Sequence, residues 1–240
     1  MKYFYFFLIL SIALISCEKN EDNLVNVNPE TPETQLPTID LSMKFEMIDL
    51  GLPSGTHWAN MNVGASSNAE VGEYYSWGEV VEFGKHEYSL YHSSTNLNED
   101  SYYVNVGNNI CGTQYDVATK ELGAYCCLPS IEQYIELLNN CKMYTYNLSG
   151  TDGYIFVGQN GNSIFFPGGG YKSHAGTEWY INTGWNWKIT HHDYGKLAYW
   201  SGSLVTNSSN WGDYGGAWAF NGNKVGFSRD FGLNIRAVGK

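Results

Sequence analysis

Thiols and imidazoles are the side chains through which this protein could do covalent or metal chemistry. The sequence contains five cysteines, at positions 17, 111, 126, 127 and 141, and an adjacent pair of histidines, His191 and His192. A cysteine can be acylated, be oxidised to a disulfide, bind a metal or act as a nucleophile. Which of these applies depends on the segment in which each cysteine lies.

Cys17 directly follows an apolar segment that has the composition of a secretory signal. The segment runs from Tyr3 to Ile15 behind a single cation, Lys2. It is shorter than the roughly 20 residues that a helix needs to cross a bilayer, but it suits the apolar core of a signal peptide. The stretch "LISC" that ends it has the pattern of a bacterial lipobox, in which the cysteine is acylated and becomes the first mature residue. We therefore predict a signal peptide over residues 1–16 and a lipid anchor on Cys17; the alternative is an ordinary signal peptide with an incidental cysteine.

The residues after Cys17 predict an extended tether outside the cell. Residues 18–41 contain six acidic residues, one lysine, three prolines and few large apolar side chains, which is the composition of a solvated spacer. The stretch "EKNED" resembles the acidic export signal of surface lipoproteins in Bacteroides-like bacteria. We expect residues 17–42 to form a lipidated, disordered acidic tether. The protein is then an outer-membrane lipoprotein that is held by its lipid anchor and exposed on the cell surface.

Residues 43–240 have the length and composition of a single domain with its own core. Because Lys2 contributes +1 and the tether −5 to the formal net charge of −11, this domain carries −7. Such a surface repels the phosphates of nucleic acids and of anionic lipids. We therefore expect no nucleic-acid partner.

The cysteines of the domain are candidates for disulfides. Once Cys17 is acylated, Cys111, Cys126, Cys127 and Cys141 remain, an even number in an oxidising compartment. They could form two disulfides, for which three pairings exist. A bond from Cys126 or Cys127 to Cys141 would join the two ends of a predicted helix and leave Cys111 for the other bond. Buried free thiols are the alternative.

The histidine pair lies in the stretch "THHDYG". Adjacent imidazoles point to opposite faces of an extended chain, and neither His174 nor Glu178 has a convincing spacing for a further ligand. The sequence also offers no pair of catalytic carboxylates, no Ser-His-Asp arrangement and no phosphate loop. We therefore predict no metal site, no cofactor and no catalytic residue.

The eight tryptophans divide into two sets by their surroundings. Four fall at predicted core or strand positions, where burial is expected: Trp58, Trp77, Trp200 and Trp218. The other four lie among small polar residues in predicted loops: Trp179, Trp185, Trp187 and Trp211. Exposed rings of this kind offer flat apolar faces to a sugar or a protein, and Asn210 and Asp213 could bond hydroxyl groups. The alternative is that residues 173–195 fold back and bury their own rings.

Two hairpins are predicted by strand-like runs on either side of an Asn-Gly dipeptide. Residues 153–157 and 163–166 flank the first dipeptide, and residues 217–220 and 224–227 flank the second. Asn-Gly favours a tight turn in which both central residues have positive φ. Antiparallel pairing is therefore expected in both places.

One helix is predicted near residues 130–141. Ser130 and Gln133 have the spacing of a capping box, and the apolar residues behind them recur at helical intervals as far as Cys141. Ile135 and Leu138 belong to this apolar stripe. Together with the hairpins, the helix predicts an α+β domain that is dominated by antiparallel strands.

Several stretches of the domain, taken in order, resemble the Fibrobacter succinogenes major paralogous domain, which is common in lipoproteins of Bacteroides-like bacteria. They are "IDLGLPSGTHWANMNVGA", "YYSWGE", "ICGTQYDVA", "CLPSIEQYIELLNNC", "GQNGNSIFFPGGGY", "YWSGS" and "GFSRDFGLNIRAVGK". The resemblance covers nearly all of residues 46–240 and implies a C-type-lectin-like fold, which is looped, mostly antiparallel and has its two ends close together. The chain departs from the family where Cys126 and Cys127 replace a Trp-Arg pair, and where residues 173–195 are longer and more aromatic. The family brings no established activity.

These observations favour a non-enzymatic surface lipoprotein whose lectin-like domain binds an extracellular ligand. A glycan would stack on the loop rings and bond to the polar residues beside them: Trp179, Trp185, Trp187, Asn210, Trp211 and Asp213. The alternative is a structural or interaction protein that docks onto another envelope protein through the same face. An enzyme is the least supported function.

Overall fold

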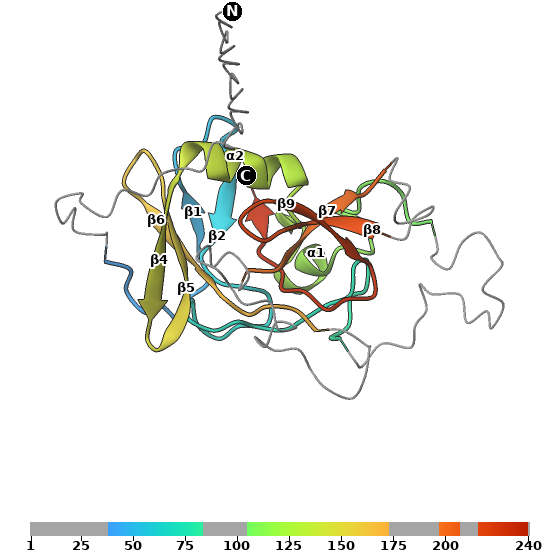
Figure 1. Ribbon diagram of the computed structural model, residues 1–240, viewed down its shortest axis with the longest axis horizontal. Coiled ribbons are helices and arrows are strands. Elements are labelled where there is room, and N and C mark those ends of the chain that lie inside the picture. Colours follow the sequence, from blue (N-terminus) through green and yellow to red (C-terminus); the bar gives the residue numbers. More distant parts are fainter. Residues whose placement is uncertain (1–37, 84–104, 173–196, 207–215, 240) are drawn as a thin grey trace, which may run out of the picture. The chain divides into compact units, whose positions relative to one another are not determined.

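The computed structural model describes residues 38–83, 105–172, 197–206 and 216–239 (Figure 1). The chain divides into two units after Leu36, and every described residue belongs to the unit that begins at Pro37. The helices of the described part are too short and too polar to pass through a bilayer.

The described residues form ten strands and two helices. In chain order these are β1 (Met47–Asp49), β2 (His57–Ala59), α1 (Val117–Leu122), β3 (Cys126–Cys127), α2 (Ile131–Asn140), β4 (Lys142–Leu148), β5 (Thr151–Val157), β6 (Ser163–Pro167), β7 (Tyr199–Leu204), β8 (Gly216–Phe220), β9 (Lys224–Ser228) and β10 (Val238–Gly239). The strands make three small sheets, in the orders β1-β2-β10-β3, β4-β5-β6 and β7-β8-β9. All pairings between these strands are antiparallel. The predicted α+β class dominated by antiparallel strands is confirmed.

Both ends of the domain lie in the same sheet. Val238 in β10 is opposite Trp58 in β2 on one side and opposite Cys127 in β3 on the other. The last strand therefore inserts between two strands from much earlier in the chain. The resemblance implies ends that lie close together, and this arrangement agrees with it.

Both predicted hairpins are present, but their turns differ from the prediction. In the β5–β6 hairpin, the Gly161 N–H donates to the Gly158 carbonyl at 3.1 Å, and the Gly158 N–H donates to the Asn162 carbonyl at 2.8 Å. Only Gly161, with φ of 85°, has a positive φ, and Asn160 does not. This is a three-residue loop that ends in a left-handed glycine, so the expected turn with two positive φ values is wrong. The turn between β8 and β9 likewise has positive φ only at its glycine, Gly222.

The predicted helix is confirmed as α2. The Ser130 hydroxyl accepts from the Gln133 N–H, and the Gln133 side chain accepts from the Ser130 N–H, which completes the capping box. α2 packs on β7, β8 and β9 (Figure 1). Its predicted apolar stripe is too wide, because Ile135 is 37 % exposed. The shorter helix α1 was not predicted.

Three of the four tryptophans expected in the core are buried. Trp77 and Trp200 belong to one apolar cluster and Trp58 to a second. The indole N–H of Trp77 donates to the Ser201 carbonyl, and that of Trp200 to the Tyr75 carbonyl, each at 2.8 Å. Burial therefore leaves neither of these two donors unsatisfied, whereas the buried indole N–H of Trp58 has no hydrogen-bond partner among the described residues.

The fourth tryptophan of that set departs from the prediction. Trp218 is only half-buried: it faces the same side of β8 as the fully buried Phe220 and packs against the second apolar cluster, while Ala217 and Ala219 face the first. The ammonium of Lys224, on the paired strand β9, lies 4.0 Å from the centre of the Trp218 ring. A cation thus covers one face of this ring.

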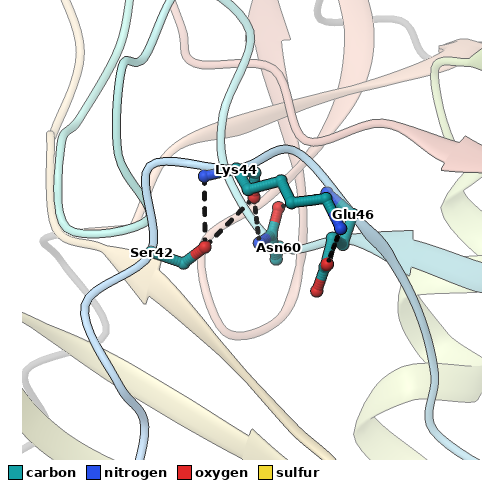
Figure 2. A network of polar contacts seen from close by, with 4 residues as sticks. All are labelled: Ser42, Lys44, Glu46 and Asn60. Atoms are coloured by element: carbon teal, nitrogen blue, oxygen red, sulfur yellow. Dashed lines mark hydrogen bonds and ion pairs between the residues drawn. The ribbon is translucent and has the colours of Figure 1, made fainter.

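The chain enters the domain along a ladder of hydrogen bonds to asparagine side chains (Figure 2). The Asn60 amide donates to the Lys44 carbonyl at 2.9 Å and accepts from the Glu46 N–H at 3.0 Å. Lys44 also forms an exposed ion pair with Glu46. Further along, the Asn68 side chain accepts from the Ser42 N–H at 2.9 Å. These bonds hold residue 42, the last residue that the composition assigns to the tether.

Candidate functional site

The residues that the sequence predicts to bind a ligand lie outside the described part of the chain. They are Trp179, Trp185, Trp187, Asn210, Trp211 and Asp213. The acylation site Cys17 and the pair His191 and His192 also lie outside it. Three segments lie between described parts of the domain, residues 84–104, 173–196 and 207–215, and the last two carry the predicted ligand-binding residues. We call the described part of the domain the framework; it includes the positions at which these segments begin and end.

Two of these segments begin beside one residue of the framework, Gly232. Lys172, which precedes residues 173–196, exchanges both backbone hydrogen bonds with Gly232 at 2.8 Å. Phe83, which precedes residues 84–104, packs on the same glycine. A β-carbon at position 232 would lie 2.7 Å from the Phe83 ring, so only glycine admits this contact without displacement.

The described residues that follow segment 84–104 run along β7. The Leu204 N–H donates to the Asn108 carbonyl, and the Ile110 N–H donates to the Gly202 carbonyl, each at 2.9 Å. Asn109 pairs with Ser203 between these two bonds. Residues 108–110 thus lie alongside the last half of β7.

Segments 173–196 and 207–215 also meet the framework at β7. Leu197, the first described residue after segment 173–196, lies two residues before β7 begins. Beside it, the Asn234 N–H donates to the Ala198 carbonyl at 3.1 Å. Residues 207–215 connect β7 to β8, and the Val205 N–H donates to the Gly216 carbonyl at 3.0 Å. All three segments are therefore attached around β7 and the short stretch 232–234.

Aromatic rings support this part of the framework. Tyr171, Phe227 and Phe231 contact one another edge to face, with ring centres 5.4 to 5.9 Å apart. The Lys172 ammonium lies 4.2 Å from the centre of the Tyr74 ring. Burial lowers the pKa of Lys172, and nearby acidic side chains oppose that shift. The attachment points are thus built on packed side chains.

The thiols of the domain are all free, and two of them lie together. The Sγ atoms of Cys111 and Cys127 are within 4.8 Å of each other and of an Asp116 carboxylate oxygen. The sequence left three pairings open, one of which joins Cys111 to Cys127 and Cys126 to Cys141, with buried free thiols as the alternative. In the structure the thiol neighbour of Cys127 is Cys111.

Asp116 positions the backbone beside each of these two thiols. A single oxygen, Oδ2, accepts from the Gly112 N–H at 2.8 Å and from the Leu128 N–H at 3.0 Å. The other oxygen, Oδ1, accepts from the N–H groups of Ala118 and Thr119 and so caps helix α1. Asp116 is fully buried. One carboxylate therefore ties together the residue after Cys111, the residue after Cys127 and the start of a helix.

The two thiols differ in acidity. A hydrogen bond from the Cys127 thiol lowers the pKa of Cys111. The same bond, together with burial, raises the pKa of Cys127. Burial raises the pKa of the neighbouring Cys126 thiol. Cys111 is therefore the thiol that ionises first in this pair.

The fourth cysteine lines a separate hollow. Asn139, Asn140, Cys141 and Lys142 form one wall and residues 157–159 the other, around a volume of about 340 Å³. Burial, with a smaller effect of Glu136, raises the pKa of Cys141 to about 11. The side-chain amides of the hollow could bond hydroxyls, but none of the described residues that line it is aromatic, so they offer a sugar no ring to stack on.

Asp116 is the site residue that the sequence analysis missed, although its signals are present. It is the N-cap of a segment of helix-forming residues, "VATKEL", that ends at Gly123, where φ is 94°. The segment is only six residues long and lacks a clear apolar stripe, which is the stronger signal.

Comparison of the chain with models of known families, with curated proteins and with solved structures found no match.

Proposed function

We propose that this protein is an outer-membrane lipoprotein that binds an extracellular ligand, most favourably a glycan, and catalyses no reaction. The signal peptide over residues 1–16, the acylated Cys17 and the acidic tether supply the location. The ordered set of motifs supports membership of the Fibrobacter succinogenes major paralogous family and a C-type-lectin-like fold. The sheet that holds both ends of the domain agrees with that fold.

The observation that carries the proposal is the shared attachment of three segments around β7. Segments 173–196 and 207–215 contain all four loop tryptophans. The third segment, 84–104, contributes four tyrosines. Loops that a rigid scaffold brings together are a common basis for binding sites. Indole and phenol rings from several loops would stack on sugar faces, and Asn210 and Asp213 would bond hydroxyl groups.

A glycan array tests this function. The purified full-length protein in detergent is applied to the array, and each glycan that binds is titrated by calorimetry. Changing Trp185 and Trp187 together to alanine should weaken binding by about tenfold or more, since removal of a stacked ring at a binding hot spot costs about 1–2 kcal/mol or more.

The matched control is Tyr125→Ala, which removes an aromatic ring that is 89 % exposed and lies outside the three segments. This variant should bind like the wild type. Equal binding by the double tryptophan variant, or no glycan bound by the wild type, would rule out glycan binding through these rings.

A second candidate function, docking onto another envelope protein, is favoured by the chain just before β1. Leu41, Met43 and Phe45 alternate along this stretch and are 54 %, 78 % and 36 % exposed. Ser42 and Lys44 alternate with them and are engaged in the polar network of Figure 2. A row of exposed apolar side chains on an extended segment suits a protein partner better than a sugar.

This alternative is tested by cross-linking in intact cells. A partner protein should be captured by the wild type and lost when Leu41, Met43 and Phe45 are changed together to serine. Loss of the same partner from the Trp185→Ala, Trp187→Ala variant would instead place the protein contact on the aromatic segments.

A further inference from the structure

The thiols of Cys111 and Cys127 lie close together at a place where the Asp116 carboxylate bonds to two parts of the chain, the Gly112 N–H and the Leu128 N–H. Cys111 follows the stretch that runs along β7, and Cys127 lies in β3 of the sheet that contains both ends of the domain. We propose that these two cysteines are a redox-active pair that forms an intramolecular disulfide on contact with a small-molecule disulfide.

The fixed backbone on both sides carries this proposal. The Gly112 and Leu128 N–H groups bond to the same Asp116 oxygen, so the peptide after each cysteine is held in place. Gly202 confines Cys111 from the other side, since a β-carbon at position 202 would lie 3.3 Å from the Cys111 nitrogen. With Sγ atoms already within 4.8 Å, rotation of the two side chains supplies the remaining approach to the bond length of about 2 Å.

The chemistry of Asp116 argues against a metal at this place. A carboxylate offers about four lone-pair positions, and Asp116 already accepts from four backbone N–H groups. The Thr119 hydroxyl lies 3.0 Å from Oδ2 as well. Among the described residues this leaves two thiols as ligands, whereas zinc takes four. Oxidation of the pair needs no further ligand.

The reaction proceeds by two exchanges. The Cys111 thiolate attacks one sulfur of the oxidant, which forms a mixed disulfide and releases the other half of the oxidant as a thiolate. The Cys127 thiol then loses its proton and attacks the Cys111 sulfur, which releases the second thiolate. Two electrons and two protons pass from the protein to the oxidant. The acidity order of the pair, with Cys111 the stronger acid, suits this sequence.

The cross-link would fix one attachment point of the proposed binding face. Residues 105–110 connect the end of segment 84–104 to Cys111, so the disulfide joins that end to the sheet that contains β3. The bond encloses helix α1 in a loop of 15 residues between the two cysteines. The pairing depends only on described residues, whereas its formation in the cell also rests on the proposed surface location.

The test uses full-length protein that is purified in detergent, reduced, desalted and then exposed to oxidised glutathione. Proteolysis without reductant should yield a peptide pair joined through Cys111 and Cys127. The oxidised protein should melt about 6–12 °C above the reduced protein, since a loop of this size stabilises a domain of this length by that amount. Cys126→Ser and Cys141→Ser are the matched controls and should keep both results.

Several outcomes would overturn the pairing. They are a cross-link to Cys126 or Cys141, a stable glutathione adduct on Cys111 without closure, and an unchanged melting temperature. Cadmium added to the reduced protein provides a separate check, because a thiolate-to-metal absorption band lost in Cys111→Ser would indicate a metal site instead. If Cys127→Ser does not fold, peptide mapping of the wild type still decides. None of these readouts depends on glycan binding, so the two proposals can fail independently.

Discussion

The guanidinium of Arg236 lies over the ring of Phe166, with its central carbon 4.5 Å from the ring centre. Arg236 is fully buried. Its three nitrogens donate to the Asn62 side chain, the Ala59 carbonyl and the Phe165 carbonyl, each at 2.8 Å. The Arg236 side chain therefore connects β2, in the sheet that holds both ends of the domain, to β6, in the β4-β5-β6 sheet. Burial lowers the pKa of Arg236, and nearby Tyr199 and Tyr134 oppose that shift.

Arg236→Met should destabilise the domain by about 3 kcal/mol or more. Methionine fills much of the space, but it leaves three buried acceptors without donors, and each unsatisfied group costs about 1–3 kcal/mol. The free energy of unfolding is measured by urea denaturation. Lys142→Met removes an exposed cation and should change stability by less than about 0.5 kcal/mol. A similar small loss for both variants would show that the buried bonds contribute little.

Asp116→Asn should lower the free energy of unfolding by about 2–3 kcal/mol. If the new amide oxygen keeps the hydrogen bonds that cap α1, the amide nitrogen takes the place of Oδ2 beside the Gly112 and Leu128 N–H groups. These two N–H groups then face a donor and lose their acceptor. The control is Glu132→Gln, which neutralises an exposed acid in the first turn of α2. Wild-type stability of Asp116→Asn would mean that the segments on either side of α1 are held by other contacts.

Local patterns in the sequence were sufficient to predict the strand pairs of both hairpins and helix α2, because these elements form between residues that are close in sequence. The 130–141 helix follows from one capping box and an apolar stripe. The three-sheet arrangement could not be predicted in the same way. Val238 pairs with Trp58 and Cys127, which lie far from it in sequence, and no periodicity encodes that pairing.

The same limit applies to the site. The spacing of the cysteines allows three pairings, and the proximity of Cys111 to Cys127 depends on a carboxylate at position 116 that bonds beside both of them. Likewise, the meeting of Phe83 and Lys172 at Gly232 depends on the path of the whole chain. Trp218 shows a smaller effect of this kind, since Lys224 covers a ring that the strand pattern assigns to the core.

Stability should fall between about pH 10 and pH 12. Burial raises the pKa of Tyr74 to about 12 from an ordinary value of 10.0, and its hydroxyl donates to the Gly169 carbonyl at 2.6 Å. Below pH 10 the phenol is protonated in both states. Between pH 10 and 12 the unfolded chain loses this proton and the folded domain keeps it, so the unfolded state binds fewer protons and the free energy of unfolding decreases as pH rises.

Urea midpoints measured from pH 8 to pH 12 test the effect. Tyr74→Phe removes one ionisable group, so its midpoint should decline less steeply than that of the wild type, although it starts lower through the lost hydrogen bond. Tyr125→Phe changes a ring that is 89 % exposed and serves as the control with a wild-type profile. Parallel profiles for Tyr74→Phe and wild type would contradict the role of Tyr74.

Cys17→Ala should release the protein from the membrane fraction. The proposed anchor consists of acyl chains on this residue, and each buried CH₂ contributes about 0.8 kcal/mol to membrane binding. Cells fed radiolabelled palmitate should incorporate label into the wild type and into the control Cys141→Ala, but not into Cys17→Ala. Membrane binding of the unlabelled variant at the wild-type level would show that something other than lipid holds the protein.

Gly232→Ala should be much more destabilising while the Phe83 ring is present. The new methyl group would lie 2.7 Å from the Phe83 ring, and such overpacking costs about 1–3 kcal/mol. The backbone at this position does not have a positive φ, so alanine introduces no strain of its own. In a Phe83→Ala background the ring contacts at 2.7 Å are gone and only the β-carbon of residue 83 remains close, at 3.1 Å, so Gly232→Ala should then cost much less. The double-mutant cycle, measured by urea denaturation, therefore yields a coupling of at least about 1 kcal/mol. If the two variants are additive, Phe83 and Lys172 do not share Gly232 as a common support, and the attachment of segments 84–104 and 173–196 at one point has to be abandoned.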